Sequence, residues 1–427
     1  MSEKKFERRI EQAAGLAEGA AMKLFTKNFT LLVLGQVFSL VGNFTLKFAL
    51  SMYVLEKTGS AAVFGGLLSA SMIPTVLLTP FGGVLADRAN RRTIMVCLDL
   101  LSGLSVLAAL LCFSDSSGIA VTGALLAALS VLGAFESPTV QACVPQMQSG
   151  ENILRGNAVV NQVSALTGLA APFLGGLFYA AFGVRPALAA AAACFFLTAL
   201  LECFIRLPSV QAGKQQKISA ILREDLLDST RFLRRERREV LELLLFVALC
   251  SAFAVGTVVV GLPFLIRAEL GLSAQLYGAA ESAMGLAAVL AGLAAGILAG
   301  RLPFRRLNGL VSAMGGCVVL AGAAMMIPAE PLCRYGLLLA AFCGGQAAVT
   351  VFSIFALSAI QERTPEHMTG KVMAYTASIT MCAQPVGQLM YGLFFDAAAG
   401  SAYLVLLPTG AVIWALGHCS KKLFENW

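Results

Sequence analysis

The chain has 427 residues, of which 58% are hydrophobic and only 13% are charged, and its mean hydropathy is +0.80. Soluble domains carry about 25% charged residues, so this composition excludes a water-soluble globular protein. The net charge of +7 indicates attraction to anionic membrane lipid, and we expect no binding to nucleic acid.

Apolar segments long enough to cross a bilayer follow one another along the chain, since a bilayer core about 30 Å thick needs roughly 20 apolar residues in a helix. Eight contain no charged residue: 58–86, 116–135, 156–184, 243–266, 307–329, 335–361, 372–395 and 397–420. Four more carry one charge: 28–55 (Lys47), 94–114 (Asp99), 186–205 (Glu202) and 270–300 (Glu281). The sequence therefore predicts an all-α membrane protein with twelve transmembrane helices.

Basic residues lie mostly at one end of the predicted helices. With the N-terminus placed in the cytoplasm, 26 of the 31 Lys and Arg residues fall in cytoplasmic segments, four fall in external segments, and Lys47 lies inside a helix. Because Lys and Arg are retained on the cytoplasmic side, this distribution predicts that both termini are cytoplasmic.

Two landmarks recur at one constant offset, which is half the length of the chain. The segment that begins at Gly83, GVLADR, returns at 296–301 as GILAGR, and Pro172 returns as Pro385. This repeat predicts two pseudo-symmetric six-helix bundles in the same orientation, at 28–206 and 242–427. Parallel repeats of this kind place a substrate site between the halves, near the middle of the bilayer.

Two polar segments flank the first half. Residues 1–27 and the linker 207–241 each space apolar residues at helical intervals opposite charged ones, which predicts amphipathic helices on the cytoplasmic membrane surface. We expect the linker to tether the halves; a partner-binding or regulatory surface is the alternative.

The corner after the second predicted helix combines Asp87 with Arg88, Arg91 and Arg92. A carboxylate at the C-terminal end of a helix is disfavoured by the helix dipole, so Asp87 needs a favourable partner. The neighbouring arginines are candidates, and so is the N-terminus of a helix that begins near Thr369. If that helix belongs to the other half, the contact forms only when the halves are closed at the cytoplasmic side.

The motif GGVLADRANRR at 82–92 resembles the loop signature between helices two and three of the major facilitator superfamily, roughly G-x-L-A-D-R-x-G-R-R/K. Segments such as SPTVQACVPQM, LRGNAVVNQ and QERTPEHMTGKVMA resemble the bacterial branch with macrolide-efflux and enterobactin-export proteins. The resemblance implies that Gly83, Asp87, Arg88, Arg91 and Arg92 stabilise an outward-facing state. Asn90 stands where Gly is usual, and we expect it to tolerate a left-handed backbone.

Pro172, Gly175 and Gly176 form the segment APFLGG, which resembles the fifth-helix motif of antiporters. A proline with small neighbours frees a backbone carbonyl and lets an adjacent helix approach closely, which suits a hinge or a proton-tight seal. Ordinary packing of small residues is the alternative.

Charged residues inside the membrane cost about 2.5 to 3.5 kcal/mol each and therefore need a reason. The resemblance implies that Glu136, on the fourth helix, faces a central cavity, where it would bind protons or substrate; a structural ion pair and a lipid-interface position are the alternatives. Lys47 and Glu281 lie at similar depths, so they either pair across the halves or meet water separately. Asp99 and Glu202 are expected to contact the cytoplasmic arginines.

Uncharged polar residues complete the predicted lining of the cavity. The amides of Gln36, Asn43, Gln162 and Gln346 lie on predicted helices among apolar neighbours. Apolar walls with a few amides suit a bulky amphipathic molecule.

The sequence contains no phosphate-binding GxxxxGK[ST] motif and no metal-ligand spacing of Cys or His, so we expect neither an enzyme nor a cofactor or metal. The leading hypothesis is a monomeric, proton-coupled exporter of a small molecule in the bacterial cytoplasmic membrane. A metabolite importer or facilitator of the same fold is the first alternative. A membrane sensor or assembly protein that does not transport is the second.

Overall fold

The computed structural model describes residues 24–207, 232–234, 237–298, 303–421 and 424, and these contain helices and no strand. Most of the two predicted amphipathic segments, 1–27 and 207–241, lies outside the described residues. The first half contains α2 (Lys27–Thr58), α3 (Ala61–Arg88), α4 (Arg91–Cys112), α5 (Gly118–Met147), α6 (Glu151–Phe182) and α7 (Val184–Glu202). The second half contains α9 (Arg238–Val255), η1 (Gly256–Gly261), α10 (Leu262–Phe264), η2 (Leu265–Glu269), α11 (Ala274–Leu298), η3 (Phe304–Arg306), α12 (Leu307–Met326), α13 (Pro331–Glu362), α14 (Glu366–Ala397) and α15 (Tyr403–Cys419).

Ten of the described helices are long and apolar enough to cross a membrane, counting α9 to η2 as one. The chain is therefore a multi-pass membrane protein. α15 is apolar but has only 17 residues, and α14 and α15 occupy the positions of the last two predicted spans. The count of twelve spans and the cytoplasmic termini stay predictions.

Side chains at the helix ends explain how the spans connect through very short links. Thr26 accepts a hydrogen bond from the backbone N–H of Phe29, and Ser60 accepts one from that of Val63, so both cap a helix N-terminus. Gly59 ends α2 with φ of 62°, a conformation that glycine adopts without strain. Backbone groups without partners are costly in lipid, and these caps keep the links compact.

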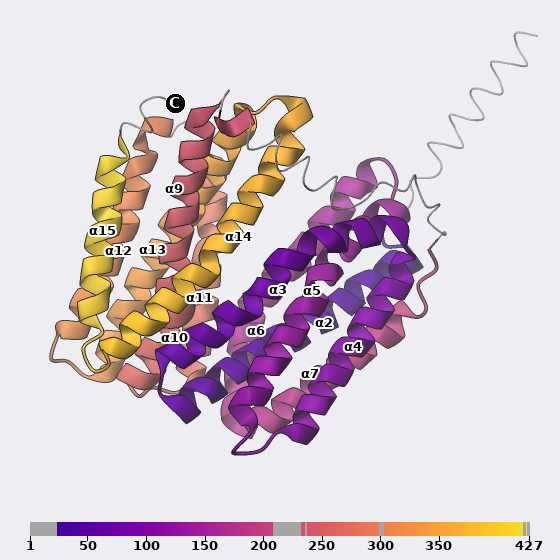
Figure 1. Ribbon diagram of the computed structural model, residues 1–427, viewed down its shortest axis with the longest axis horizontal. Helices are drawn as coiled ribbons and strands as arrows, with labels where there is room; N and C mark the ends of the chain where they lie inside the picture. The colour runs from indigo at the N-terminus through magenta and orange to yellow at the C-terminus, as the bar shows by residue number, and fades with distance from the viewer. Residues whose placement is uncertain (1–23, 208–231, 235–236, 299–302, 422–423, 425–427) are drawn as a thin grey trace, which may run out of the picture.

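Figure 1 shows the helices in two groups, α2 to α7 and α9 to α15. The groups meet along two seams, in which α3 packs on α14 and α6 packs on α11. We call the end that carries the start of α2 and the end of α15 the terminal end, and the opposite end, with the α2–α3 link, the far end. The groups converge toward the far end and diverge toward the terminal end (Figure 1).

Candidate functional site

Both seams depend on glycines that allow two backbones to touch. A Cβ atom at Gly65 of α3 would lie 2.5 Å from the carbonyl oxygen of Gln388 on α14. A Cβ atom at Gly278 of α11 would lie 2.4 Å from the carbonyl oxygen of Pro172 on α6. Any larger residue at either position would push the helices apart. Gly65 and Gly278 are related by the same offset as the two sequence landmarks, so the two seams are equivalent.

A serine one turn further along each helix ties the seam with a hydrogen bond. Ser69 donates to the carbonyl oxygen of Pro385 at 2.8 Å, and Ser282 donates to that of Leu169 at 2.6 Å. The repeat offset relates these serines as well. Each acceptor lies at or near one of the two prolines of the repeat, Pro172 and Pro385. The predicted close approach of a neighbouring helix at Pro172 is therefore found, and its partner is α11.

Gly175 and Gly176 take different positions around the same seam. Gly176 faces α11, where an added Cβ atom would lie 2.9 Å from the carbonyl oxygen of Ala274. Gly175 instead faces α2, where its Cβ atom would lie 3.4 Å from Phe48. The predicted small-residue motif thus packs α6 against α2 of its own half and against α11 of the other half.

At the far end, a carboxylate from one half binds the helix N-terminus of the other. Asp396, near the end of α14, accepts hydrogen bonds from the hydroxyl of Ser60 and the backbone N–H of Ala61, both at 3.0 Å. Ser60 is the N-cap of α3. The negative charge thus meets the positive end of the α3 dipole, which favours the contact. This bond joins the same two helices that the sequence predicts to be joined through Asp87 at the terminal end.

A second bridge at the far end joins α2, α6 and η2. Arg267 of the second half forms an ion pair with Glu56 at the end of α2. Tyr179 of α6 donates its hydroxyl to the other carboxylate oxygen of Glu56 at 2.7 Å. The far end is therefore held closed at two separate places.

A cavity of about 370 Å³ lies between the halves. Its floor toward the far end includes Phe48 and Tyr277, whose rings stack across the interface with centroids 5.1 Å apart. The lining comes from α2, α3 and α6 on one side and from η1, α11 and α13 on the other: Phe44, Lys47, Phe48, Ser51, Phe64, Leu68, Gly168, Pro172, Val258, Val259, Tyr277, Glu281, Met284, Gly285, Ala288 and Gln346. We call it the central cavity.

Lys47 and Glu281 both line the central cavity, from opposite halves. No ion pair joins them among the described residues. The hydroxyl of Tyr277, one turn before Glu281, interacts with the Glu281 carboxyl. The cavity therefore presents an amine and a carboxyl group that a bound molecule can contact separately.

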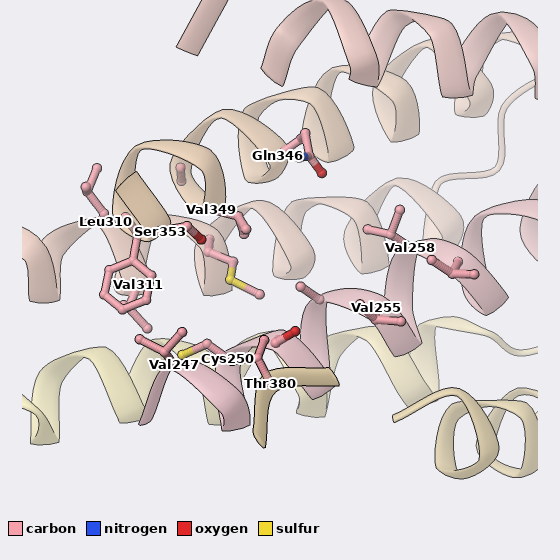
Figure 2. A pocket seen from close by; sticks show the side chains of 16 residues that line it. Val247, Cys250, Val255, Val258, Leu310, Val311, Gln346, Val349, Ser353 and Thr380 are labelled. Atoms are coloured by element: carbon pink, nitrogen blue, oxygen red, sulfur yellow. The ribbon is translucent and has the colours of Figure 1, made fainter. Parts of the chain in front are cut away.

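An apolar pocket of about 260 Å³ inside the second half adjoins the central cavity. Gln346, Val258 and Val259 line both spaces. Figure 2 shows Gln346 and Val258 on one side of this pocket and Val247, Leu310 and Val311 on the other. Val258 and Val259 belong to η1, where the chain forms a π-helix, an irregularity that often marks functional sites.

Glu136 does not line the central cavity, contrary to the expectation from the family resemblance. It accepts a hydrogen bond from Ser39 at 3.1 Å inside the first half, and the same hydroxyl lies 3.2 Å from Asp99. Lys47 is near enough to attract Glu136 electrostatically. Glu136 therefore lies within electrostatic reach of Lys47, which lines the cavity.

The expectation that Asp99 and Glu202 contact cytoplasmic arginines is wrong. Asp99 is 2% exposed and accepts a hydrogen bond from Ser39. Glu202 is 1% exposed, and neither of its carboxylate oxygens has a hydrogen-bond partner among the residues that the structure describes. Sequence reasoning also missed Ser39, because a serine in an apolar helix carries no distinctive pattern.

The corner arginines bind backbone carbonyls within their own half. Arg91 donates to the carbonyl oxygens of Ala86 at 2.8 Å and Ala142 at 2.7 Å, and Arg92 donates to that of Cys203. These carbonyls lie near helix C-termini, where the dipole favours a cation. The Asp87 side chain and the surroundings of Gly83 lie outside the described side chains, and Arg88 is exposed.

Asn90 does not use the left-handed backbone that the sequence suggested. Its φ is −67°, and its side chain accepts a hydrogen bond from the N–H of Thr93 as the N-cap of α4. Asparagine is a favoured N-cap, which explains why it can replace glycine here.

The predicted amides take three different positions. Gln346 lines the central cavity. Gln36 and Asn43 lie on α2, and each has one buried polar atom without a hydrogen-bond partner among the described residues. Gln162 is exposed and is not part of the cavity lining.

A model of the Major Facilitator Superfamily matches residues 32–388 of the chain. This protein belongs to the major facilitator superfamily. The chain is 23% identical to the macrolide efflux protein A of Streptococcus pyogenes over 385 residues, which cover 88% of this chain and 91% of the relative. It is 26% identical to the multidrug efflux pump Tap of Mycolicibacterium fortuitum over 379 residues, 86% of this chain and 88% of that one.

Solved structures share the fold of this superfamily member. The nucleoside transporter NupG superposes with a TM-score of 0.76 at 13% identity, covering 95% of this chain and all of NupG. A bacterial homologue of the iron transporter ferroportin, described as inward-facing, gives 0.68 at 16% identity, covering 94% of this chain and 98% of the homologue. The chain is thus a multi-pass transporter of the bacterial cytoplasmic membrane.

Proposed function

We propose that this transporter exports bulky amphipathic small molecules in exchange for protons, by opening a central cavity alternately to the two sides of the membrane. The efflux activity named for its relatives supports export. With the termini in the cytoplasm, as the distribution of basic residues predicts, the far end is external. The closed far end then corresponds to a conformation that receives substrate from the cytoplasm.

The central cavity between the halves is the observation that carries this proposal. Lys47 offers an amine, Glu281 a carboxyl group and Gln346 an amide, and the adjoining pocket in the second half offers an apolar surface. A molecule with an apolar body and a polar or charged group can satisfy these groups together. The apolar body would occupy the pocket beyond Gln346, while the polar group stays in the central cavity.

The residues at the two ends, in the seam and behind the cavity take gating, coupling and binding roles in this proposal. Asp396 and Glu56 close the external end, and Asp87, with Gly83, Arg88, Arg91 and Arg92, closes the cytoplasmic end in the opposite conformation. Pro172, Gly175 and Gly176 keep the α6–α11 seam tight while the ends open and close. Glu136 exchanges protons with the cavity past Lys47, and Gln36 and Asn43 add polar contacts.

Reconstituted protein tests this proposal directly. In liposomes loaded with ethidium or a radiolabelled macrolide, an imposed pH gradient should drive movement of the probe against its own gradient. Glu136→Gln should abolish the dependence on the pH gradient while binding of the probe persists, because the amide keeps the shape of the side chain and loses its proton exchange.

Glu330→Gln is the matched control, because Glu330 is exposed and makes no side-chain capping bond at the start of α13. Its transport should match that of the unchanged protein. Transport that runs only down the probe's gradient in unchanged protein would indicate a facilitator. Absence of any flux, with normal folding, would contradict transport.

A further inference from the structure

The hydroxyl of Ser39 lies between two carboxyl groups in the interior of the first half. Its oxygen is 3.1 Å from Oε1 of Glu136 and 3.2 Å from Oδ1 of Asp99. A hydroxyl has one proton to donate and lone pairs that accept, so it can donate to one carboxylate while accepting from the other carboxyl when that is protonated. Ser39 therefore connects Glu136 and Asp99 as a hydrogen-bonded chain.

Glu202 extends this chain toward the terminal end. It is the last residue of α7 and is 1% exposed, and neither of its carboxylate oxygens has a hydrogen-bond partner in the described part of the chain. Its carboxyl interacts with that of Asp99, and its Oε1 would lie 3.7 Å from a Cβ atom at Gly35, one turn from Ser39. A buried carboxyl with unused hydrogen-bonding capacity is unusual and points to something that it binds.

No described lysine or arginine compensates Asp99 and Glu202, since none forms an ion pair with either carboxyl. Arg91 and Arg92 bind backbone carbonyls, and Lys47, which lines the cavity, attracts Glu136. The other titratable neighbours, Cys143 and Cys203, bring no positive charge. Asp99 and Glu202 lie on the packed helices α4 and α7 and are 2% and 1% exposed. Two carboxylates buried in this way without a compensating cation cannot both be ionised, so the pair needs a proton.

We propose that Asp99 and Glu202 form a proton-binding site inside the first half, loaded from the central cavity through Glu136 and Ser39. A protonated Glu136 gives its proton to the Ser39 oxygen as the Ser39 hydroxyl gives its own proton to Asp99. One O–H bond breaks and one forms at Ser39, which ends unchanged, and the proton is then shared with Glu202 at the terminal end. The site takes protons and no other ligand, and only its role in coupling rests on the proposed function.

Infrared spectroscopy tests the site without any substrate. Buried protonated carboxyls absorb separately from carboxylates, so the reconstituted protein should show a protonated-carboxyl band that persists at neutral pH. Asp99→Asn and Glu202→Gln should each remove or shift this band. Asp115→Asn and Glu242→Gln are the matched controls, because these carboxyls are exposed and paired with Lys57 and Arg238; both should leave the band unchanged.

Ser39→Ala separates the path from the site. This variant should keep the protonated-carboxyl band but slow its response to a pH jump. Ser105→Ala should respond as the unchanged protein does, because the Ser105 hydroxyl donates to the carbonyl oxygen of Leu101 within its own helix. Thermal unfolding checks that each variant is folded. If Asp99→Asn and Glu202→Gln are both folded and both keep the band unchanged, the proposal is overturned.

Proton-driven efflux of ethidium gives the functional readout. In Glu202→Gln, efflux should fall to the rate measured without a pH gradient, while ethidium still binds. Unchanged coupling in both Asp99→Asn and Glu202→Gln would refute the role in coupling. If the unchanged protein moves no probe at all, the proposed function fails, and the infrared result still decides whether the site binds a proton.

Discussion

Asp396 shows how one residue can hold two bundles together without a strong bond. Its carboxylate reaches two donors at the N-terminus of α3, and both donors belong to the other half. A charge at a helix N-terminus contributes about 0.3 to 1 kcal/mol at an exposed position. That is a small fraction of the stability of either bundle. The whole of it nevertheless contributes to the free-energy difference between the conformations with a closed and an open far end.

Asp396→Asn should shift that balance toward an open far end. Asparagine keeps one acceptor for Ser60 or Ala61 but loses the charge, so a loss of about 1 kcal/mol should increase the open population about fivefold. Spin labels at Ala181 and Ala399, which are exposed at the far end of the two halves, would report the change as a longer interlabel distance.

Asp115→Asn is the appropriate control for this measurement. Asp115 also lies at the far end, but its partner, Lys57 at 2.8 Å, belongs to the same half. Losing that bond should leave the distance distribution unchanged. Equal shifts in both variants would show that charge at this end, and not the bridge between halves, controls the opening.

At the level of single residues, the sequence predicted the depth of the charged residues in the membrane better than it predicted the groups that they contact. Lys47 and Glu281 were placed at similar depths and do share a cavity. Asp99 and Glu202 were assigned arginine partners that instead bind carbonyls at helix ends. A one-dimensional pattern fixes the depth of a residue in the membrane, but the direction in which its side chain points depends on how the helices are rotated against each other.

At the level of helices, the two seams account for how closely the halves pack. Gly278 allows α11 to touch the α6 backbone beside Pro172, and Gly65 does the same for α3 and α14. The sequence predicted the repeat and the close approach at Pro172. It did not indicate the glycine and serine pair on each partner helix, although the repeat offset relates the two pairs and could have revealed them.

Gly278→Ala should open the α6–α11 seam. The added methyl group would lie 2.4 Å from the Pro172 carbonyl oxygen and 3.3 Å from Cα of Phe173, and neither backbone atom can move independently. Overpacking of this kind costs about 1 to 3 kcal/mol, so the melting temperature of the purified protein should fall. Gly292→Ala on the same helix has nothing within 4 Å and should melt at the same or a higher temperature, because alanine favours helices. Equal melting of both variants would contradict a tight seam.

At the level of the whole molecule, the bridges at the far end and the divergence at the terminal end describe one of two conformations that the proposed transport cycle needs (Figure 1). The Glu56–Arg267 bridge joins the halves at a place different from the Asp396 contact. A covalent link between positions 56 and 267 should therefore keep the far end closed and prevent the change to the other conformation, even if the seams remain free to move.

Glu56→Cys combined with Arg267→Cys, in a protein otherwise free of cysteine, should stop transport when the two thiols are joined by a short, cleavable cross-linker. Cleavage should restore the rate of the uncrosslinked double variant. Lys57→Cys with Asp115→Cys provides the control, because Lys57 and Asp115 bond to each other within one half, and their link should leave transport intact. Full transport with the link between positions 56 and 267 in place would exclude opening at this end.

The α3–α14 contact divides α3 into two parts of unequal length. If the Ser69–Pro385 hydrogen bond is taken as the fulcrum, the arm to Ala61 measures about 12 Å and the arm to Arg88 about 28 Å, at 1.5 Å per residue. A rotation that parts the short arm by a few ångströms swings the long arm more than twice as far. The far end can therefore open as a narrow aperture while the terminal end opens wide, which suits the proposed export, in which a bulky molecule enters at the terminal end and leaves at the far end.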